Sequence, residues 1–286
     1  MQAIEMRFPG GRKKALTLSY DDGVEQDIRL MEILKKNGLK CTFNLNSGDY
    51  SPEGTVFEAG RVHRRMTRQA CIDLYKGSGM EVAVHGLNHP WFDRLPANVC
   101  NAQICLDRTN LEKDFEQPVR GAAYPFGTYN DEVVDILAKN GICYARTVNA
   151  TMNFEIPTDW LRLRPTCHHG VPELQQLTDT FLNGKVKGGP WLFYLWGHSY
   201  EFEQFDCWQI IEKFAEQTGH HEDIWYATNI EVYDYVKAFE ALIFSNDFSM
   251  VQNNSCMDVY FEFSDYDFPE GKIFAAPAGK LTKLKD

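Results

Sequence analysis

Leu16-Thr17-Leu18-Ser19-Tyr20 leads directly into Asp21-Asp22-Gly23, and this junction decides how the chain folds. The first five residues predict a β-strand, because they form an apolar, β-prone run that ends at a turn. Asp-Asp-Gly is typical of such a turn. The spacing of apolar residues over 24–37 then predicts an amphipathic helix that ends at Gly38. A strand, a turn with two carboxylates and a helix together indicate an α/β protein whose polar groups follow strand ends.

A second junction of the same kind lies further along the chain. Met80-Glu81-Val82-Ala83-Val84 predicts a strand, and His85-Gly86-Leu87-Asn88-His89 follows it. Histidines at this spacing can present both imidazoles on one side of a loop or helical turn, which suits a divalent metal ion. Each motif alone is ordinary. Together they predict a site in which Asp22 completes a His, His, Asp ligand set and Asp21 stays free as a base.

The rest of the chain repeats the order of apolar strand, polar loop and helix. Further strands are predicted at residues 40–45, 119–123, 142–148, 160–163 and 190–195, and helices at 67–76, 96–115, 132–139, 172–182, 207–217 and 230–244. This alternation favours a parallel sheet covered by helices, and about seven units fit a closed or nearly closed barrel. One rim of a barrel collects the C-terminal ends of its strands. We expect the residues that follow predicted strands to meet there: Asp21, Asp22, His85, Phe126 and His198.

Residues 246–286 show a different pattern. Residues 249–263 and 272–284 alternate like β-strands, and Pro269-Glu270-Gly271 between them is typical of a turn. The sequence therefore predicts a barrel domain over residues 1–245 and a short C-terminal β-hairpin appendage over residues 246–286.

Composition limits the partners of the protein and its location. The net charge of −11 and the pI near 5.2 disfavour nucleic acid and anionic membranes, because there is no basic patch to neutralise phosphates. No apolar run is long enough to span a membrane. The N-terminus lacks a signal-peptide pattern, and the scattered cysteines include no C-x-x-C pair. These features favour a cytoplasmic protein with reduced thiols, or a secreted one if a signal peptide has been removed; oligomeric state is not predicted.

The predicted site suits hydrolysis of an amide or an ester. One divalent metal ion on Asp22, His85 and His89 would activate water and polarise a carbonyl group. Zinc is the first expectation, and cobalt, nickel, manganese and iron accept the same ligands. Asp21 is expected to take a proton from the water, and His198 is expected to protonate the leaving nitrogen or oxygen.

These motifs resemble those of the polysaccharide deacetylases of the NodB-homology group, carbohydrate esterase family 4. The family's Thr-Phe-Asp-Asp-Gly motif corresponds to Ser19-Tyr20-Asp21-Asp22-Gly23, and its His-Ser/Thr-x-x-His motif corresponds to His85 and His89. The third family motif ends in Pro-Tyr-Gly, which is similar to Pro125-Phe126-Gly127. The last motif places a histidine after an apolar strand, as His198 is placed here.

The resemblance covers roughly residues 12–235 and implies both a fold and a set of roles. The implied fold is a distorted (β/α)7 barrel, in agreement with the number of predicted strands. The implied roles are base for Asp21, metal ligand for Asp22, His85 and His89, acid for His198, and donor to the oxyanion for the backbone N–H of Phe126.

The chain departs from the family pattern at two positions. Gly86 replaces the Ser/Thr of the second motif, and Ala123 stands where many members have an arginine that orients the catalytic aspartate. Arg162 and Arg164 on a neighbouring strand are candidates for the missing arginine. Asp159-Trp160 is the candidate for the family's Asp-Trp motif, which orients the catalytic histidine.

Aromatic side chains near the motifs are candidates for contact with substrate. Tyr124 precedes the third motif, Trp91 follows the histidine pair and Trp196 ends an apolar strand. We expect these three to line the cleft with Phe126. Cys167-His168-His169 suggests a second metal site, but successive side chains of an extended segment point opposite ways, so at most one of the two histidines should face the pocket.

Motifs and resemblance together predict a metal-dependent hydrolase that removes N-acetyl or O-acetyl groups from a carbohydrate. Two alternatives stay open. One is an allantoinase-like hydrolase of another non-peptide C–N bond, acting on a small amide. The other is a catalytically silent barrel that binds glycan, with the missing arginine and Ser/Thr as the first signs of lost activity.

Overall fold

A curled parallel sheet forms the centre of the computed structural model, which describes residues 3–285. Its hydrogen-bonded strands follow the order β6-β5-β4-β3-β2-β8-β7, and β9 also pairs with β2. The strands are β2 (Lys14–Asp21), β3 (Cys41–Leu45), β4 (Glu81–Val84), β5 (Gly121–Ala123), β6 (Tyr144–Arg146), β7 (Cys167–His168), β8 (Trp191–Gly197) and β9 (Ile224–Tyr226). This arrangement confirms the predicted distorted (β/α)7 barrel.

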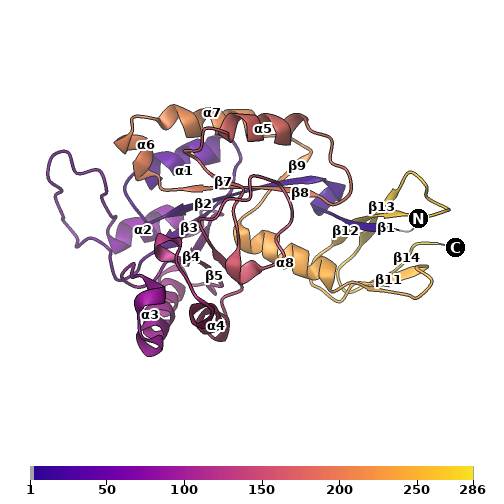
Figure 1. The fold of residues 1–286 in the computed structure, drawn as a ribbon, viewed down its shortest axis with the longest axis horizontal. Helices are drawn as coiled ribbons and strands as arrows, with labels where there is room; N and C mark the ends of the chain where they lie inside the picture. The colour runs from indigo at the N-terminus through magenta and orange to yellow at the C-terminus, as the bar shows by residue number, and fades with distance from the viewer. Residues whose placement is uncertain (1–2, 286) are drawn as a thin grey trace.

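Helices cover the sheet on both sides (Figure 1). They are α1 (Asp27–Lys36), α2 (Arg68–Tyr75), α3 (Ala97–Phe115), α4 (Asp131–Lys139), α5 (Leu174–Asn183), α6 (Tyr200–Gln204), α7 (Trp208–Thr218) and α8 (Asn229–Glu240). Helices α1, α5 and α7 lie along one side of the strands, and α3, α4 and α8 lie along the other. Within residues 3–285, no helix combines the length and the hydropathy needed to cross a membrane.

Strand β2 shows how the sequence places polar groups inside the barrel. All eight of its residues are buried, and side chains alternate between its two faces. Leu16, Leu18 and Tyr20 belong to the large apolar core. Thr17 and Ser19 lie on the opposite face, where they hydrogen-bond to Asn229 and Asn44. Asp21 continues this polar face, so the alternation of the strand delivers its carboxylate to the barrel interior at the rim.

Two predictions of local structure differ from the fold. Residues 160–163, expected as a strand, form a 3-10 helix (Trp160–Arg162), because the side chain of Asp159 caps it by accepting a hydrogen bond from the backbone N–H of Arg162. The helix expected over residues 230–244 ends at Glu240, and Ile243–Phe244 forms strand β10 instead.

The C-terminal segment is β structure, as predicted, but it is more than a hairpin. It contributes to two three-stranded antiparallel sheets, β1-β12-β13 and β10-β11-β14. The strands are β1 (Ala3–Arg7), β10 (Ile243–Phe244), β11 (Met250–Gln252), β12 (Val259–Ser264), β13 (Lys272–Ala276) and β14 (Leu281–Lys283). Because β1 pairs with β12, the N-terminal strand belongs to this β module and not to the barrel. No local pattern predicts this pairing, since the two strands lie at opposite ends of the chain.

Candidate active site

Three strand ends bring the predicted catalytic and metal-binding residues together. Asp21 is the last residue of β2, His85 follows β4, and His198 follows β8. The register pairs β2 with β8 as far as Tyr20 and Gly197, so His198 emerges beside Asp21. His198 Nε2 lies 3.7 Å from Asp21 Oδ2, and His85 Nε2 lies 3.8 Å from the same oxygen. The predicted convergence at one rim is therefore present in the fold.

Asp22, His85 and His89 form a cluster whose ligand atoms all lie within 4.8 Å of one another. His89 Nε2 lies 3.1 Å from His85 Nε2 and 3.8 Å from Asp22 Oδ1. His85 Nδ1 is 2.9 Å from the carbonyl oxygen of Ala123, so Nδ1 carries the proton and Nε2 presents its lone pair to the cluster. Burial lowers the pKa of His85 to about 4, which keeps the imidazole neutral. Two imidazoles and a carboxylate in this arrangement fit a divalent metal ion.

The loop that carries the two histidines is held by backbone contacts. Asn46 Nδ2 donates to the carbonyl oxygens of His85 and Gly86, at 2.6 and 2.7 Å. The buried carboxylate of Asp107 accepts hydrogen bonds from the backbone N–H groups of Ser47 and His85. Gly86 has a φ of +80°, and a Cβ at this position would lie 2.9 Å from the ring of Phe92. The glycine that replaces the family's Ser/Thr is thus required by the local backbone.

Asp21 is held by an arginine that the sequence did not predict. Arg146 at the end of β6 pairs with Asp21 Oδ2, and both side chains are almost fully buried. Asn44 Nδ2 donates to Asp21 Oδ1 at 2.8 Å. Burial opposes the charged form of Asp21, but Arg146, His85 and then His198 outweigh it and lower the pKa of the carboxyl group.

The position of Arg146 accounts for the missing arginine at Ala123. The two residues are direct partners in the register between β5 and β6, so a side chain from the neighbouring strand reaches the same place. The two arginines proposed from the sequence do not do so. Arg162 pairs with Asp131 and Asp159, and Arg164 donates to backbone carbonyl groups in its own vicinity. A lone arginine in the apolar run over residues 142–148 was the available signal.

Glu201 faces Nδ1 of His198, the ring nitrogen that is not directed at Asp21. His198 Nδ1 lies 3.5 Å from Glu201 Oε1, and the backbone N–H of His198 faces Glu201 Oε2 at 3.4 Å. Burial lowers the pKa of His198, but the nearby carboxylates of Glu201 and Asp21 outweigh it and raise the pKa above its usual value. Asp159, the residue predicted for this contact, instead caps a 3-10 helix and pairs with Arg162. The prediction failed because Asp159-Trp160 matches a dipeptide pattern, whereas Glu201 lies one helical turn after the histidine that it contacts.

Asp22 has two cationic or hydrogen-bonding neighbours from the connection between β3 and α2. His63 Nε2 lies 3.1 Å from Asp22 Oδ2, and Arg65 Nη2 lies 3.2 Å from Asp22 Oδ1. Arg65 also donates to the backbone carbonyl oxygen of Asp22 at 2.8 Å, which supports a backbone with a φ of +82°. Burial opposes ionisation, but His63, His85 and Arg65 hold the pKa of Asp22 well below its usual range. The sequence contained no motif for His63 or Arg65.

The segment that contains His63 is anchored to the site although the connection is long. Figure 1 shows this connection projecting from the barrel. The segment returns beside the first motif, where Val24 and Arg65 form an antiparallel bridge and the backbone N–H of Met66 donates to Gly23. His63 and Arg65 are therefore held near Asp22 by backbone pairing.

The four aromatic candidates occupy different environments. Phe126 is 46% exposed and has a φ of +58°. Its ring stacks on Trp91 at a centroid distance of 3.9 Å and meets His89 edge-on at 4.5 Å. The guanidinium of Arg94 lies 4.1 Å from the centroid of the Trp91 ring. Trp91 is therefore held between Arg94 and Phe126.

Tyr124 and Trp196 are both buried. The hydroxyl group of Tyr124 donates to the carbonyl oxygen of Leu161, and its 1% exposure leaves no surface for a substrate. The Trp196 ring lies 4.3 Å from the guanidinium of Arg146, where it shields the ion pair with Asp21 from water.

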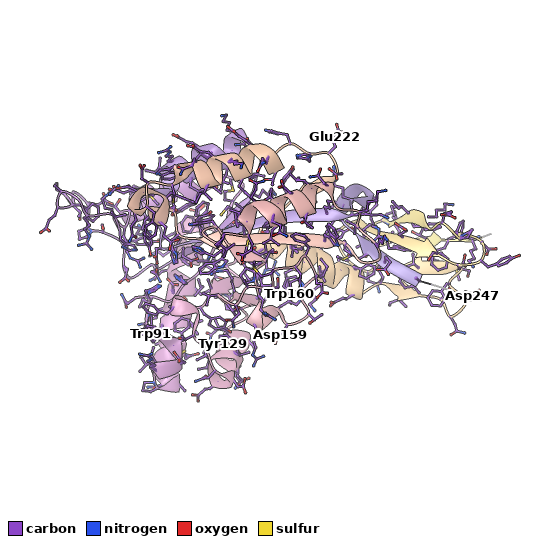
Figure 2. The ribbon with its side chains drawn as sticks, turned by 45° about the horizontal axis from the view of Figure 1, so that its top comes forward. Trp91, Tyr129, Asp159, Trp160, Glu222 and Asp247 are labelled. Atoms are coloured by element: carbon purple, nitrogen blue, oxygen red, sulfur yellow. The ribbon has the colours of Figure 1, made fainter. Side chains whose placement is uncertain are left out.

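Figure 2 labels Trp91 near the opposite end of the molecule from Asp247, so the barrel site and the β module lie apart.

His168 and His169 both contact Glu201, which differs from the expectation that only one of them faces the pocket. Their Nε2 atoms lie 3.0 and 3.2 Å from Glu201 Oε2. The alternation rule does not apply because β7 ends at His168, and the backbone turns at Gly170. His168, His198 and Glu201 form a second group whose possible ligand atoms lie within 4.8 Å of one another.

Comparison with known families agrees with the motifs. The sequence profile of the family described as polysaccharide deacetylase matches residues 9–145. The predicted resemblance to this family is thereby confirmed, over a stretch that makes up just under half of the chain. The comparison with curated proteins finds no match. His198 and Glu201 lie beyond the matched part.

Solved structures include similar folds. A Mycobacterium smegmatis protein, provisionally named as a polysaccharide deacetylase, matches with a TM-score of 0.57 and 15% identity over 84% of this chain and 96% of that one. A family 4 carbohydrate esterase from Streptomyces lividans, in complex with acetate, matches with a TM-score of 0.49 and 15% identity over 76% and 93%. The deacetylase PplD of Streptococcus pyogenes matches with a TM-score of 0.41 and 24% identity over 46% of this chain, which spans only 55% of that protein. The first of these supports the barrel fold.

Proposed function

We propose that the protein is a metal-dependent hydrolase that removes an acetyl group from the nitrogen or the oxygen of a carbohydrate. The observation that carries the proposal is the position of Asp21. Its carboxylate forms an ion pair with Arg146 and lies 3.7 Å from His198 Nε2. It also lies beside the cluster of Asp22, His85 and His89. This arrangement puts a base, a metal-binding cluster and an acid around one point, as amide hydrolysis requires.

The residues of the chain divide the reaction between them. Asp21 accepts a proton from the attacking water, and the water oxygen forms a bond to the acyl carbon. His198 then donates the proton on Nε2 to the leaving nitrogen, the C–N bond breaks, and acetate and the free amine leave. Arg146 keeps Asp21 ionised before the transfer and in its orientation throughout, because the ion pair is buried.

Asp22, His85 and His89 would hold the metal ion. When bound, a divalent cation supplies Lewis acidity to the water and to the carbonyl group. Zinc is our first choice because two imidazoles and one carboxylate are common zinc ligands, and cobalt, nickel, manganese and iron fit the same donors. The hydrogen bond from His85 Nδ1 to the carbonyl oxygen of Ala123 orients the imidazole so that Nε2 can bind the metal ion.

The Pro125-Phe126-Gly127 turn would form the oxyanion side of the site. Phe126 has a left-handed backbone conformation that is uncommon for a residue with a side chain. Trp91 stacks on its ring and stabilises this conformation. We assign the backbone N–H of Phe126 as the donor to the developing oxyanion, and its exposed ring as a surface for the sugar.

The test is acetate release from a panel of N-acetylated and O-acetylated oligosaccharides. The metal-free protein is prepared with a chelator and compared with samples reloaded with zinc, cobalt, nickel, manganese or iron. We expect release from at least one carbohydrate that is lost on chelation and restored by metal. Release from small amides alone would replace the carbohydrate with an allantoinase-like substrate. Carbohydrate binding without any release would identify a glycan-binding barrel and contradict the proposal.

A further inference from the structure

Glu201 lies between three imidazoles, which is more than the orientation of one catalytic histidine needs. His168 and His169 contact Oε2 at 3.0 and 3.2 Å, and His198 Nδ1 faces Oε1 at 3.5 Å. Burial opposes the charged form of Glu201, but the hydrogen bonds from His168, His169 and His198 lower the pKa of its carboxyl group well below the usual range. An ionised carboxylate can only accept hydrogen bonds, so the two nitrogens closest to it, Nε2 of His168 and Nε2 of His169, must carry a proton. His198 Nδ1 is buried without a hydrogen-bond partner, and Glu201 Oε1 is the acceptor that it faces.

The protonation state of His168 follows from its other nitrogen. The backbone N–H of Gly170 donates to His168 Nδ1 at 3.1 Å. A backbone N–H is always a donor, so Nδ1 must be the acceptor and the proton must be on Nε2. His168 is therefore a neutral imidazole that donates to Glu201 from Nε2.

The same reasoning applies to His169. Its Nδ1 lies 3.3 Å from the hydroxyl oxygen of Tyr20, and its ring lies between Tyr20 and Phe202. Burial lowers the pKa of His169 to about 4, so the ring is neutral near physiological pH. Since Glu201 needs the proton on Nε2, Nδ1 accepts a hydrogen bond from the Tyr20 hydroxyl group.

These tautomers distinguish the group of His168, His198 and Glu201 from the predicted metal-binding group of Asp22, His85 and His89. His85 donates from Nδ1 to the Ala123 carbonyl and leaves the lone pair of Nε2 free for a metal ion. His168 has the opposite arrangement, because its Nδ1 faces an N–H donor and its Nε2 keeps a proton. Metal binding at His168 Nε2 would require a proton on Nδ1, against the N–H of Gly170. The second group of possible ligand atoms therefore fits a hydrogen-bond network better than a metal ion.

We propose that His168 and His169 are positioning residues that hold Glu201 as a fixed carboxylate, so that Glu201 keeps a proton on His198 Nδ1 and turns His198 Nε2 toward Asp21. This inference rests on the proposed function, in which His198 is the acid. Two neutral donors fix the carboxylate without adding positive charge that would repel a proton on His198. The network thus orients the acid while leaving it able to be charged.

The groups that face His198 come from three elements. Asp21 on β2 and Glu201 on α6 are the acidic neighbours, and they favour the charged imidazole. His168 on β7 lies with its ring centroid 6.4 Å from that of His198, and Tyr200 on α6 lies at 5.2 Å. Neither adds a charge in the network proposed here, so Glu201 and Asp21, with Asp22 beyond them, favour the charged form of His198.

The decisive variants are His168→Leu and His168→Gln. His168 is partly exposed, so both variants should fold, whereas His169 is buried among aromatic rings and is a poorer site for substitution. Leucine removes the donor to Glu201, and glutamine can restore one through its amide. His220→Gln is the control, because His220 hydrogen-bonds to the carbonyl oxygen of Lys36 and lies on another surface loop.

Kinetics on the zinc-loaded protein provide the first measurement. We expect His168→Leu to lower kcat about tenfold with KM and zinc content unchanged, and His168→Gln to recover most of the loss. The high-pH limb of kcat should also move in Glu201→Gln. Loss of the carboxylate lowers the pKa of His198, so activity should fall at a lower pH than in the wild type. Equal activity of wild type, His168→Leu and His168→Gln would overturn the proposal.

Nitrogen NMR of the histidine side chains tests the inference without any turnover. We expect the proton of His168 and of His169 on Nε2, with Nδ1 unprotonated in both rings, and the proton of neutral His198 on Nδ1. A proton on His168 Nδ1, or a second equivalent of zinc that disappears in His168→Leu, would overturn the network. If no acetate is released by any sample while the NMR result is as expected, the proposed function fails and the tautomer network stands.

Discussion

At the scale of single residues, the site depends on groups that no motif contains. Arg146 and Asn44 hold Asp21, and Asn46 and Asp107 hold the loop of the metal-binding histidines. Arg146 reaches Asp21 from β6, on the far side of the sheet, and Asn44 reaches it from the adjacent strand β3. Asn46 follows β3, whereas Asp107 lies on α3. Motifs predicted the reacting atoms because these follow strand ends in the sequence. They could not predict the supporting groups, because those contacts depend on strand register and on side-chain direction.

Replacing Arg146 should abolish most of the activity. In Arg146→Met, the buried carboxylate of Asp21 loses its counter-charge, its pKa rises, and the base becomes protonated near neutral pH. We expect kcat/KM to fall about a hundredfold or more. The same change should lower the free energy of unfolding by about 3 kcal/mol, because the buried carboxyl group of Asp21 loses its ion-pair partner. Acetate release and urea unfolding measure the two effects.

Two further variants separate the causes. Arg162→Met, at a surface ion pair, should keep activity within about twofold and stability within about 0.5 kcal/mol. The double variant Arg146→Met/Asp21→Asn should regain stability without regaining activity. Wild-type activity in Arg146→Met would show that another group ionises Asp21.

His63 should affect metal binding. Its hydrogen bond to Asp22 Oδ2 fixes the carboxylate so that Oδ1 is the oxygen nearest His89. We expect His63→Ala to weaken zinc binding about tenfold, as loss of a partner of a metal ligand commonly does. Competition with a chromophoric chelator measures the affinity. His220→Ala should leave it unchanged, and an unaltered affinity in His63→Ala would mean that Arg65 alone positions Asp22.

At the scale of elements, apolar strand runs and helix periodicity predicted the barrel well, because the strands are buried and each helix buries one face. The predicted helix at 96–115 differs from Ala97–Phe115 by one residue at its start. The failures occurred where local chemistry replaced periodicity. The capping side chain of Asp159 stabilises a 3-10 helix where a strand was expected. Strand β7 ends at His168, so alternation along a strand could not predict the direction of His169.

Glu81 joins three elements at the end of the barrel opposite the site. It accepts hydrogen bonds from Thr42 on β3, Tyr144 on β6 and the backbone N–H of Ile230 at the start of α8. Burial outweighs these hydrogen bonds and raises the pKa of Glu81 to about 7. The folded protein therefore binds a proton at Glu81 that the unfolded chain, with a pKa of about 4.5, has already released.

This linkage predicts a loss of stability as the pH rises. The contribution of the protonated Glu81 is complete below about pH 4.5 and is lost as the pH rises through about 7, and it amounts to roughly 3 kcal/mol. Wild type should lose that much more than Glu81→Gln between about pH 5 and about pH 8. Urea unfolding at each pH measures the difference. Glu240→Gln, at an exposed position of α8, is the control, and parallel pH profiles of wild type and Glu81→Gln would contradict the account.

At the scale of the whole molecule, the two ends of the chain meet in the β module. The sequence predicted its β structure but not the pairing of β1 with β12, because pairing between distant strands leaves no periodic trace in either. Val251, Phe261, Phe263, Ala276 and Leu284 form a separate small core. Ile4 from β1 packs against this core within the module, and Phe239 from α8 packs against both this core and a core of the barrel, so α8 links the two.

We expect the module and the barrel to unfold together. Phe261→Ala removes a fully buried ring and should lower the free energy of unfolding by about 3 to 5 kcal/mol. Calorimetry should show one transition at a lower temperature. Tyr266→Ala, at a side chain that is 97% exposed, is the matched control and should leave the transition unchanged. Two separate transitions, with only one moved by Phe261→Ala, would mean that the module folds on its own.

The central claim is that Asp21 is the base of a metal-dependent deacetylase and not a metal ligand. The most direct measurement compares zinc binding and acetate release from an N-acetylated oligosaccharide in wild type and Asp21→Asn. We predict one equivalent of zinc in both proteins and acetate release from the wild type alone. Equal release from both would contradict the assignment of the base, and loss of zinc from Asp21→Asn would contradict its separation from the metal cluster.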